Sequence, residues 1–135
     1  MKIKVEKTYS NDCEVRVDFS SDFGRSAAIW EGEAPAAGVF YDVELDVELD
    51  VELDVDNALV WGESVSTTSS NKAMIALEEE LFVVIGKVIS LEEDGCVSIS
   101  VGDSVILLDV ENAPKELTGH IECRASDVKL YPTNL

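Results

Sequence analysis

The strict alternation of "YDVELDVELDVELDVD", Tyr41 to Asp56, constrains this chain most. Apolar or aromatic residues occupy every odd position, and carboxylates occupy every even position. A β-strand sends successive side chains to opposite faces, so this period of two predicts a strand with one apolar and one acidic face. Such a strand would span about 53 Å, far beyond the usual length, so it should bend, project as a ribbon or be partly looped out.

The tetrapeptide VELD occurs three times within this run, at 43–46, 47–50 and 51–54. Because the unit has an even length, gaining or losing one copy keeps every side chain on its original face. Repeat expansion can therefore explain the run, and a solvated strand face is the first interpretation. A docking surface for a basic protein is the second. A calcium site is least favoured, because the evenly spaced acids lack a glycine turn that would converge oxygens on one ion.

The same period recurs elsewhere in the chain. In "MKIKVEK", Lys2 and Lys4 share one face, and we expect them to offset the acidic run across neighbouring strands. The polar stretch 64–72 is expected to be a loop, and residues 72–80 fit a short helix or a strand. From Leu81 onward the pattern predicts five short strands: 81–93, 96–101, 104–110, 118–125 and 128–132.

These patterns predict an all-β fold with little helix, arranged as a small antiparallel barrel or sandwich. A length of 135 residues suits a single domain, 1–135. A subdivision into an N-terminal β unit, 1–66, and a C-terminal β unit, 72–135, is also possible. The N-terminal strands could join the C-terminal barrel or form a second small sheet.

Residues 81–131 resemble an oligonucleotide/oligosaccharide-binding (OB) barrel in the order and spacing of their strands. A long first strand carries a mid-strand glycine, Gly86, and is followed by a hairpin, a longer connection and two closing strands. The resemblance implies a barrel that the last strand, 128–132, helps to close. Members that bind nucleic acid carry basic and aromatic residues on the binding face. Here the outward positions instead include Glu92, Glu93, Asp94, Ser98, Ser100 and Asp103.

The negative net charge of the chain limits the kinds of molecule that it can bind. The chain has 10 Lys and Arg against 28 Asp and Glu, a net charge of −18, and a pI near 4.1. Such a surface repels phosphate backbones and anionic membranes, so we expect neither nucleic acid nor a membrane as partner. The start of the chain, 1–10, has no apolar signal-peptide core, and the longest apolar run, 81–85, cannot span a membrane. We therefore expect a cytoplasmic protein.

Motifs for catalysis, metal ions or cofactors do not emerge, so we expect no enzyme, metal site or cofactor. His120 is the only histidine, and strand phase places it opposite Cys123, which argues against a nucleophilic pair. The three cysteines lack the spacing of a zinc site. Cys13 and Cys123 are expected in the core, whereas Cys96 is expected to be the most reactive thiol.

The first functional hypothesis is a non-enzymatic acidic module that docks a basic protein. In size and charge the chain is similar to bacterial immunity proteins and nucleic-acid-mimicking inhibitors. One alternative is a structural or accessory β domain whose acidity only serves solubility, and another is a small-ligand-binding OB-like barrel. The sequence leaves the partner's identity and the oligomeric state open. The expected partner-binding residues are Asp42, Glu44, Asp46, Glu48, Asp50, Glu52, Asp54, Asp56 and Trp61.

Overall fold

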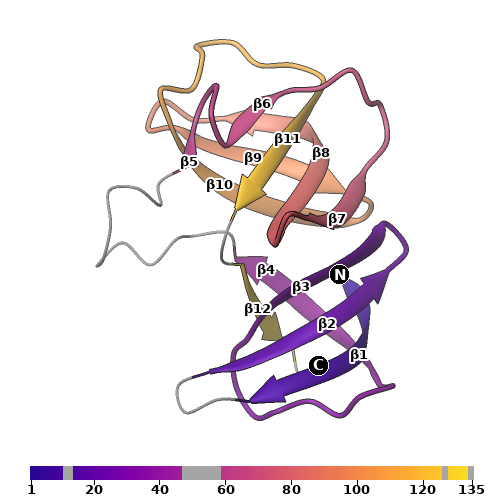
Figure 1. Cartoon of the computed structure of the whole chain (residues 1–135). Helices are drawn as coiled ribbons and strands as arrows, with labels where there is room; N and C mark the ends of the chain where they lie inside the picture. The colour runs from indigo at the N-terminus through magenta and orange to yellow at the C-terminus, as the bar shows by residue number, and fades with distance from the viewer. Residues whose placement is uncertain (11–13, 47–58, 126–127, 134–135) are drawn as a thin grey trace.

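The regular elements of the protein are β-strands throughout the part of the chain that the structure describes (Figure 1). The computed structural model describes residues 1–10, 14–46, 59–125 and 128–133. Within these ranges no helix could cross a membrane. The predicted all-β class is therefore confirmed, and the strands form two small barrel-like sheets, one above the other in Figure 1.

The first sheet is a closed barrel built from the N-terminal strands and the last strand of the chain. Its order is β1-β2-β3-β12-β4, and β4 pairs back to β1. The period-2 pattern buries Val17 and Phe19 of the second strand inside the barrel. The strands are β1 Lys2–Ser10, β2 Val15–Ser21, β3 Gly24–Trp30, β4 Phe40–Asp46 and β12 Lys129–Pro132.

The second sheet has the order β5-β10-β9-β8-β11-β6, and β7 pairs with β8 outside this path. Its core is formed by alternating apolar residues such as Val97, Ile99 and Val101, all fully buried. The strands are β5 Leu59–Val60, β6 Val65–Thr67, β7 Met74–Glu78, β8 Leu81–Leu91, β9 Cys96–Val101, β10 Ser104–Glu111 and β11 His120–Ala125.

The last strand does not close the C-terminal sheet, so the expected role of 128–132 was wrong. β12 instead pairs in parallel with β3 and antiparallel with β4, which places Leu130 fully buried in the N-terminal barrel. This position joins β3 to β4 and removes two open edges from that barrel. In the second sheet, β5 pairs with β10 and β6 pairs with β11. Each sheet thus contains strands from the other half of the chain.

The strand pairing shows the structure of two segments, 64–72 and 72–80, for which the sequence predicted a loop and left helix and strand open. The stretch 64–72 was expected to be a loop, but Val65–Thr67 forms β6 against β11. Val65 is fully buried opposite Cys123, and burying this side chain favours pairing in a segment that is otherwise polar. Residues Met74–Glu78, for which helix and strand were both open, form strand β7.

The mid-strand glycine of the long strand is confirmed. One edge of β8 pairs with β11 as far as Lys87, while the other edge pairs with β7 up to Ile85 and with β9 from Lys87 onward. A Cβ atom at Gly86 would lie 2.8 Å from the carbonyl oxygen of Ser100 and 3.0 Å from Ile99 Cδ1. The glycine therefore lets β9 approach closely at the point where β8 changes partners.

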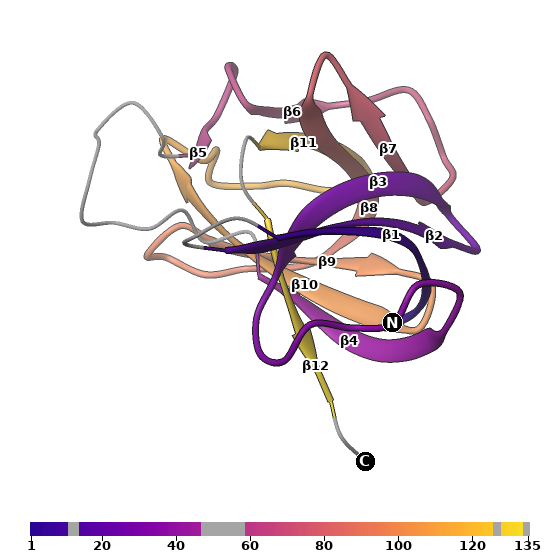
Figure 2. The ribbon, with the colours of Figure 1, turned by 60° about the horizontal axis from the view of Figure 1, so that its bottom comes forward.

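The two sheets share one core and meet where β3 approaches β7; Figure 2 shows β3 passing over β8. The N–H of Ile75 donates to the carbonyl of Phe23 at 2.9 Å. The hydroxyl of Ser26 donates to the carbonyl of Ala76 at 2.9 Å. A Cβ atom at Gly24 would overlap the carbonyl oxygen of Ile75. Glycine at this position is thus a steric condition for the contact between the sheets.

Candidate functional site

The described part of the acidic run has the two faces that its period predicts. In β4, Val43 is fully buried, whereas Asp42 and Glu44 are exposed on the outer face. The N-terminal ammonium group of Met1 donates to the carbonyl of Val43 at 2.8 Å. Tyr41 packs edge-on against the buried Trp30, with ring centroids 5.1 Å apart. The beginning of the run is therefore a strand whose apolar face belongs to the N-terminal barrel.

Of the remaining predicted binding residues, the structure describes only two, Asp46 and Trp61. Asp46 ends β4, and Trp61 is half-buried, packing on the core and donating its backbone N–H to Glu111 O at 2.9 Å. Trp61 is thus partly engaged in the core and only partly available to a partner. Five acids of the run lie outside the described residues: Glu48, Asp50, Glu52, Asp54 and Asp56.

Lysines flank the acids of β4. Lys2 lies opposite Asp42 in the β1–β4 register, in the cross-strand position that was expected. The ammonium groups of Lys2 and Lys4 also lie over the exposed ring of Phe40, 5.2 and 5.9 Å from its centroid. An open cavity of about 270 Å³ lies here, lined by Lys2, Lys4, Glu6, Ser20, Ser21, Asp22 and Phe40.

A second surface lies on the outer face of three neighbouring strands in the C-terminal sheet. The β9–β10 register pairs Ser100 with Val105 and Ser98 with Leu107, and the β8–β9 register pairs Lys87 with Ser100. The inward residues of β9 are buried, so these partners point outward. We call this surface the β8–β9–β10 face; its residues are Lys87, Ile89, Ser90, Cys96, Ser98, Ser100, Val105, Leu107 and Asp109.

Three large apolar side chains of this face are more than half exposed: Ile89 at 55%, Val105 at 59% and Leu107 at 56%. Ile89 lies in a register shift between Val88 and Ser90, where a bulge turns an extra side chain outward. Isolated exposed apolar residues are ordinary, whereas these three lie on one face of three neighbouring strands. They flank the small side chains of β9, so a partner could reach the sheet between them.

One end of the β8–β9–β10 face is acidic. The β8–β9 turn carries Glu92, Glu93 and Asp94, all exposed, and Asp109 and Glu111 are exposed on β10. The turn is held by hydrogen bonds from the N–H of Cys96 to Asp94 Oδ1, 3.1 Å, and from the N–H of Glu92 to Cys96 O, 2.9 Å. The carboxylates are therefore presented by an ordered turn directly beside the apolar side chains.

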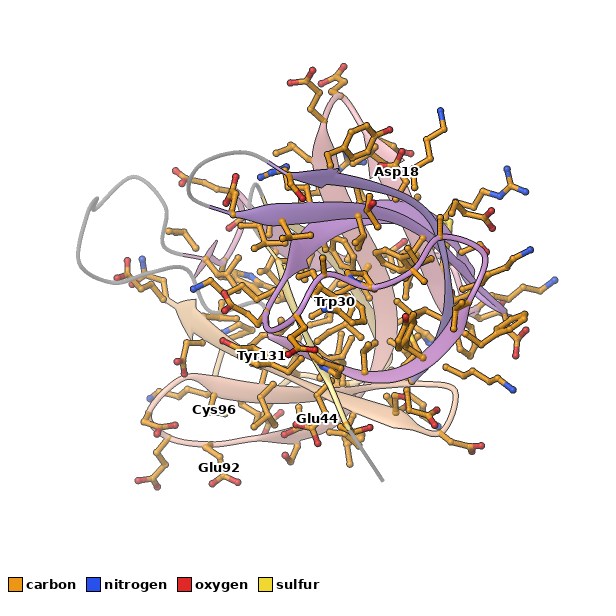
Figure 3. All side chains as sticks on the ribbon, turned by 90° about the horizontal axis from the view of Figure 1, so that it is seen from below. Asp18, Trp30, Glu44, Glu92, Cys96 and Tyr131 are labelled. Atoms are coloured by element: carbon orange, nitrogen blue, oxygen red, sulfur yellow. The ribbon has the colours of Figure 1, made fainter. Side chains whose placement is uncertain are left out.

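The acids of β4 lie on the same side of the molecule as this face. β4 approaches β10, although the two strands belong to different sheets. Figure 3 shows Glu44, Cys96 and Glu92 along one side of the molecule, with Trp30 nearer its centre. Of the predicted acids, Glu44 thus lies on the same side of the molecule as Glu92 in this view.

The sequence did not single out Val105 and Leu107 as functional residues. In "SVILLDVE" both strand phases carry apolar residues, so period alone cannot distinguish the inner face from the outer face. The available signal was the pair Asp109 and Glu111, which share their phase with Val105 and Leu107 and mark that phase as outward. Ile89 lies in a bulge, which the period also cannot indicate.

The predicted separation of the histidine from the core cysteine is observed. Cys123 is fully buried and His120 is half-buried on the other face of β11. Burial, together with the charge of Glu122, raises the pKa of the Cys123 thiol to about 12. Cys96 is half-buried, and Cys13 lies outside the described residues. Over the described ranges, no group of three or more His, Cys, Asp or Glu side chains could hold a metal ion.

Comparison with known proteins gives no match to a family model, a curated protein or a solved structure.

Proposed function

We propose that the protein is a non-enzymatic acidic binding module that docks a basic protein, as an inhibitor or immunity protein would. The observation that carries this proposal is the β8–β9–β10 face. It combines three exposed apolar side chains with an acidic end in a chain of net charge −18. We also propose that the module acts in the cytoplasm, as the sequence predicts.

The layout of the face suits protein recognition. Apolar residues at the centre of an interface contribute most when they are fully desolvated, and charged residues at the rim steer the approach. Ile89, Val105 and Leu107 would supply the centre. The turn acids Glu92 and Glu93 would accelerate encounter with a Lys/Arg-rich surface in a salt-dependent way.

We further propose that both sheets are OB-type barrels that have exchanged their closing strands. Each sheet contains three consecutive antiparallel strands, β1–β2–β3 or β8–β9–β10, and a strand from elsewhere in the chain that pairs in parallel with the third, β12 with β3 and β5 with β10. OB barrels use the face of their second and third strands for ligands, which here corresponds to β9 and β10. That face is apolar and acidic, which supports a protein ligand over a nucleic acid.

A small ligand is the second candidate function. The open cavity of about 270 Å³ beside Lys2, Lys4 and Phe40 favours it, because it gathers cationic, carboxylate, hydroxyl and aromatic groups. An accessory domain whose acidity serves solubility requires neither the β8–β9–β10 face nor the cavity. Variants of the face and of the cavity therefore distinguish protein docking, small-ligand binding and a solubility role.

The experiment is affinity capture from host lysate, with elution by a salt gradient and identification by mass spectrometry. The test variant is E92Q/E93Q/D94N combined with Leu107→Ser, which changes the acidic turn and one apolar anchor. The matched control is E79Q/E80Q/E116Q, which makes the same change in net charge at exposed positions outside the face.

We expect one basic protein to be captured by the wild type and by the control variant, and to be lost from the test variant. Equal loss from both variants would show that only net charge matters and would support the solubility function. A small molecule that copurifies with the wild type, is detected by the same mass spectrometry and is lost from Lys2→Ala/Lys4→Ala would favour the cavity.

A further inference from the structure

The phase of strand β10 determines which of its backbone groups face away from β9. The N–H of Val110 donates to the carbonyl of Gly95 at 3.0 Å, so the even-numbered residues of β10 turn their backbone groups toward β9. The carbonyl of Glu111 accepts from the N–H of Trp61 on the opposite side. Along a strand, the backbone N–H and C=O groups of successive residues point alternately to one side and the other. Those of Val105, Leu107 and Asp109 therefore point away from β9, to the side that we call the outer edge of β10.

That outer edge is only partly paired. Over the described residues, β10 has a strand partner on this side at Val110 and Glu111 alone, in the parallel pairing with β5. Natural proteins usually protect a free edge with lysine, proline or a bulge. Among the described residues, Val105 and Leu107 have no strand partner on this side, and their side chains are more than half exposed. Within the part of the chain that the structure describes, backbone groups without a strand partner and exposed apolar side chains thus occur at the same residues.

We propose that the basic partner docks by adding an extended segment to the outer edge of β10. This inference rests on the proposed function and specifies its binding mode. Main-chain hydrogen bonds to Val105, Leu107 and Asp109 would supply affinity, and side chains on alternate positions would supply specificity.

The charges around the edge define the chemistry of the added segment. Positions opposite Val105 and Leu107 on the outer face take apolar side chains, because these extend an apolar surface already present. The position opposite Asp109 takes Lys or Arg, and Glu92, Glu93 and Asp94 lie at the same end. A second copy of this chain fits poorly, since each copy carries a net charge of −18.

The probe is a synthetic peptide with blocked ends, titrated into the full-length protein; on one face it carries valine for the positions opposite Val105 and Leu107 and lysine for the position opposite Asp109. Amide hydrogen exchange is followed by NMR. We expect exchange at Val105, Leu107 and Asp109 to slow by at least about tenfold at saturation. Ile106 and Leu108, whose amides face β9, serve as internal controls and should change little.

Two N-methylated peptides, one for each set of alternate amides, complete the test. The one whose methyl groups face β10 should bind at least about tenfold more weakly.

Other outcomes would overturn the proposal in distinguishable ways. Binding that shifts the resonances of Ile89 and Leu107 without protecting the odd-numbered amides would reject strand addition and leave the docking function standing. Absence of any binding would reject this mode, and lysate capture would then decide the proposed function separately. Protection of the same amides in the free protein would show that the edge is already covered. Concentration-dependent protection would assign the edge to a second copy.

Discussion

Val110 donates its backbone N–H to the carbonyl oxygen of Gly95 at 3.0 Å, and this contact fixes the phase of strand β10. It turns Ile106 and Leu108 into the core and Val105 and Leu107 outward. Leu107 and Leu108 are neighbours in sequence and identical in chemistry. Yet one is 56% exposed and the other 1% exposed.

The first prediction uses this pair. Leu107→Ser removes an exposed side chain, so the free energy of unfolding should change by no more than about 0.5 kcal/mol. Leu108→Ala removes buried methyl groups and should cost about 2–5 kcal/mol. Urea unfolding of both variants measures the difference. A large loss for Leu107→Ser would mean that this side chain contributes to the core and is not available to a partner.

The second prediction concerns the turn between β7 and β8. Glu79 and Glu80 form a two-residue loop with positive φ angles of 51° and 67°, a conformation that favours Asn-Gly. The double variant E79N/E80G should raise the free energy of unfolding by about 1–2 kcal/mol. E79Q/E80Q removes the same charges but keeps two non-glycine residues at positive φ. Its free energy of unfolding should therefore rise by only about a few tenths of a kcal/mol. An equal gain from both variants would assign the effect to charge.

The third prediction tests the contact between the two sheets. Gly24→Ala would push a methyl group into the carbonyl of Ile75 and should cost more than about 2 kcal/mol. Gly119 also has a positive φ, but nothing lies within 4 Å of its added Cβ, so Gly119→Ala should cost only about 1–2 kcal/mol. Thermal unfolding compares the two. Similar losses would indicate that backbone conformation, and not contact with β7, requires glycine at position 24.

The fourth prediction concerns alkaline stability. Burial raises the pKa of Cys123 from 9.0 to about 12, so in this range the unfolded state releases its proton while the folded state keeps it. The contribution of the neutral thiol is therefore complete below pH 9 and is lost as the pH rises toward 12. The maximum slope is about 1.4 kcal/mol per pH unit.

Urea unfolding measured from about pH 8 to about pH 11 tests this linkage. Cys123→Ala should be less stable near neutral pH but should lose less stability than the wild type as the pH rises. Parallel pH profiles for the two proteins would show that the Cys123 thiol does not cause the alkaline loss.

The sequence predicts the strands of this fold better than their partners. Period two located β9 and β11, because each alternates between buried and half-buried side chains, and it located the start of β1, where Ile3 and Val5 are buried. The same pattern says nothing about which strands pair. β12 has the pattern of a closing strand, but its partner β3 lies about a hundred residues earlier in the chain.

The candidate site was predicted only in part, for a related reason. Asp42 and Glu44 were expected on an exposed acidic face, and the structure describes them there. Val105, Leu107 and Ile89 were missed, because an apolar residue in a strand is normally interpreted as core. Their exposure depends on the phase of β10 and on a bulge in β8, and tertiary pairing determines both.

The measurement that most directly tests the central claim is chemical-shift mapping, on the full-length protein, of the blocked peptide that carries valine for the positions opposite Val105 and Leu107 and lysine for the position opposite Asp109. A docking surface predicts saturable shifts concentrated at Ile89, Val105 and Leu107 and at the adjoining turn acids. It also predicts that Leu107→Ser weakens the binding. Shifts spread evenly over exposed acids, including Glu79, Glu80 and Glu116, and unaffected by Leu107→Ser, would show nonspecific attraction to a negatively charged protein and would contradict the account.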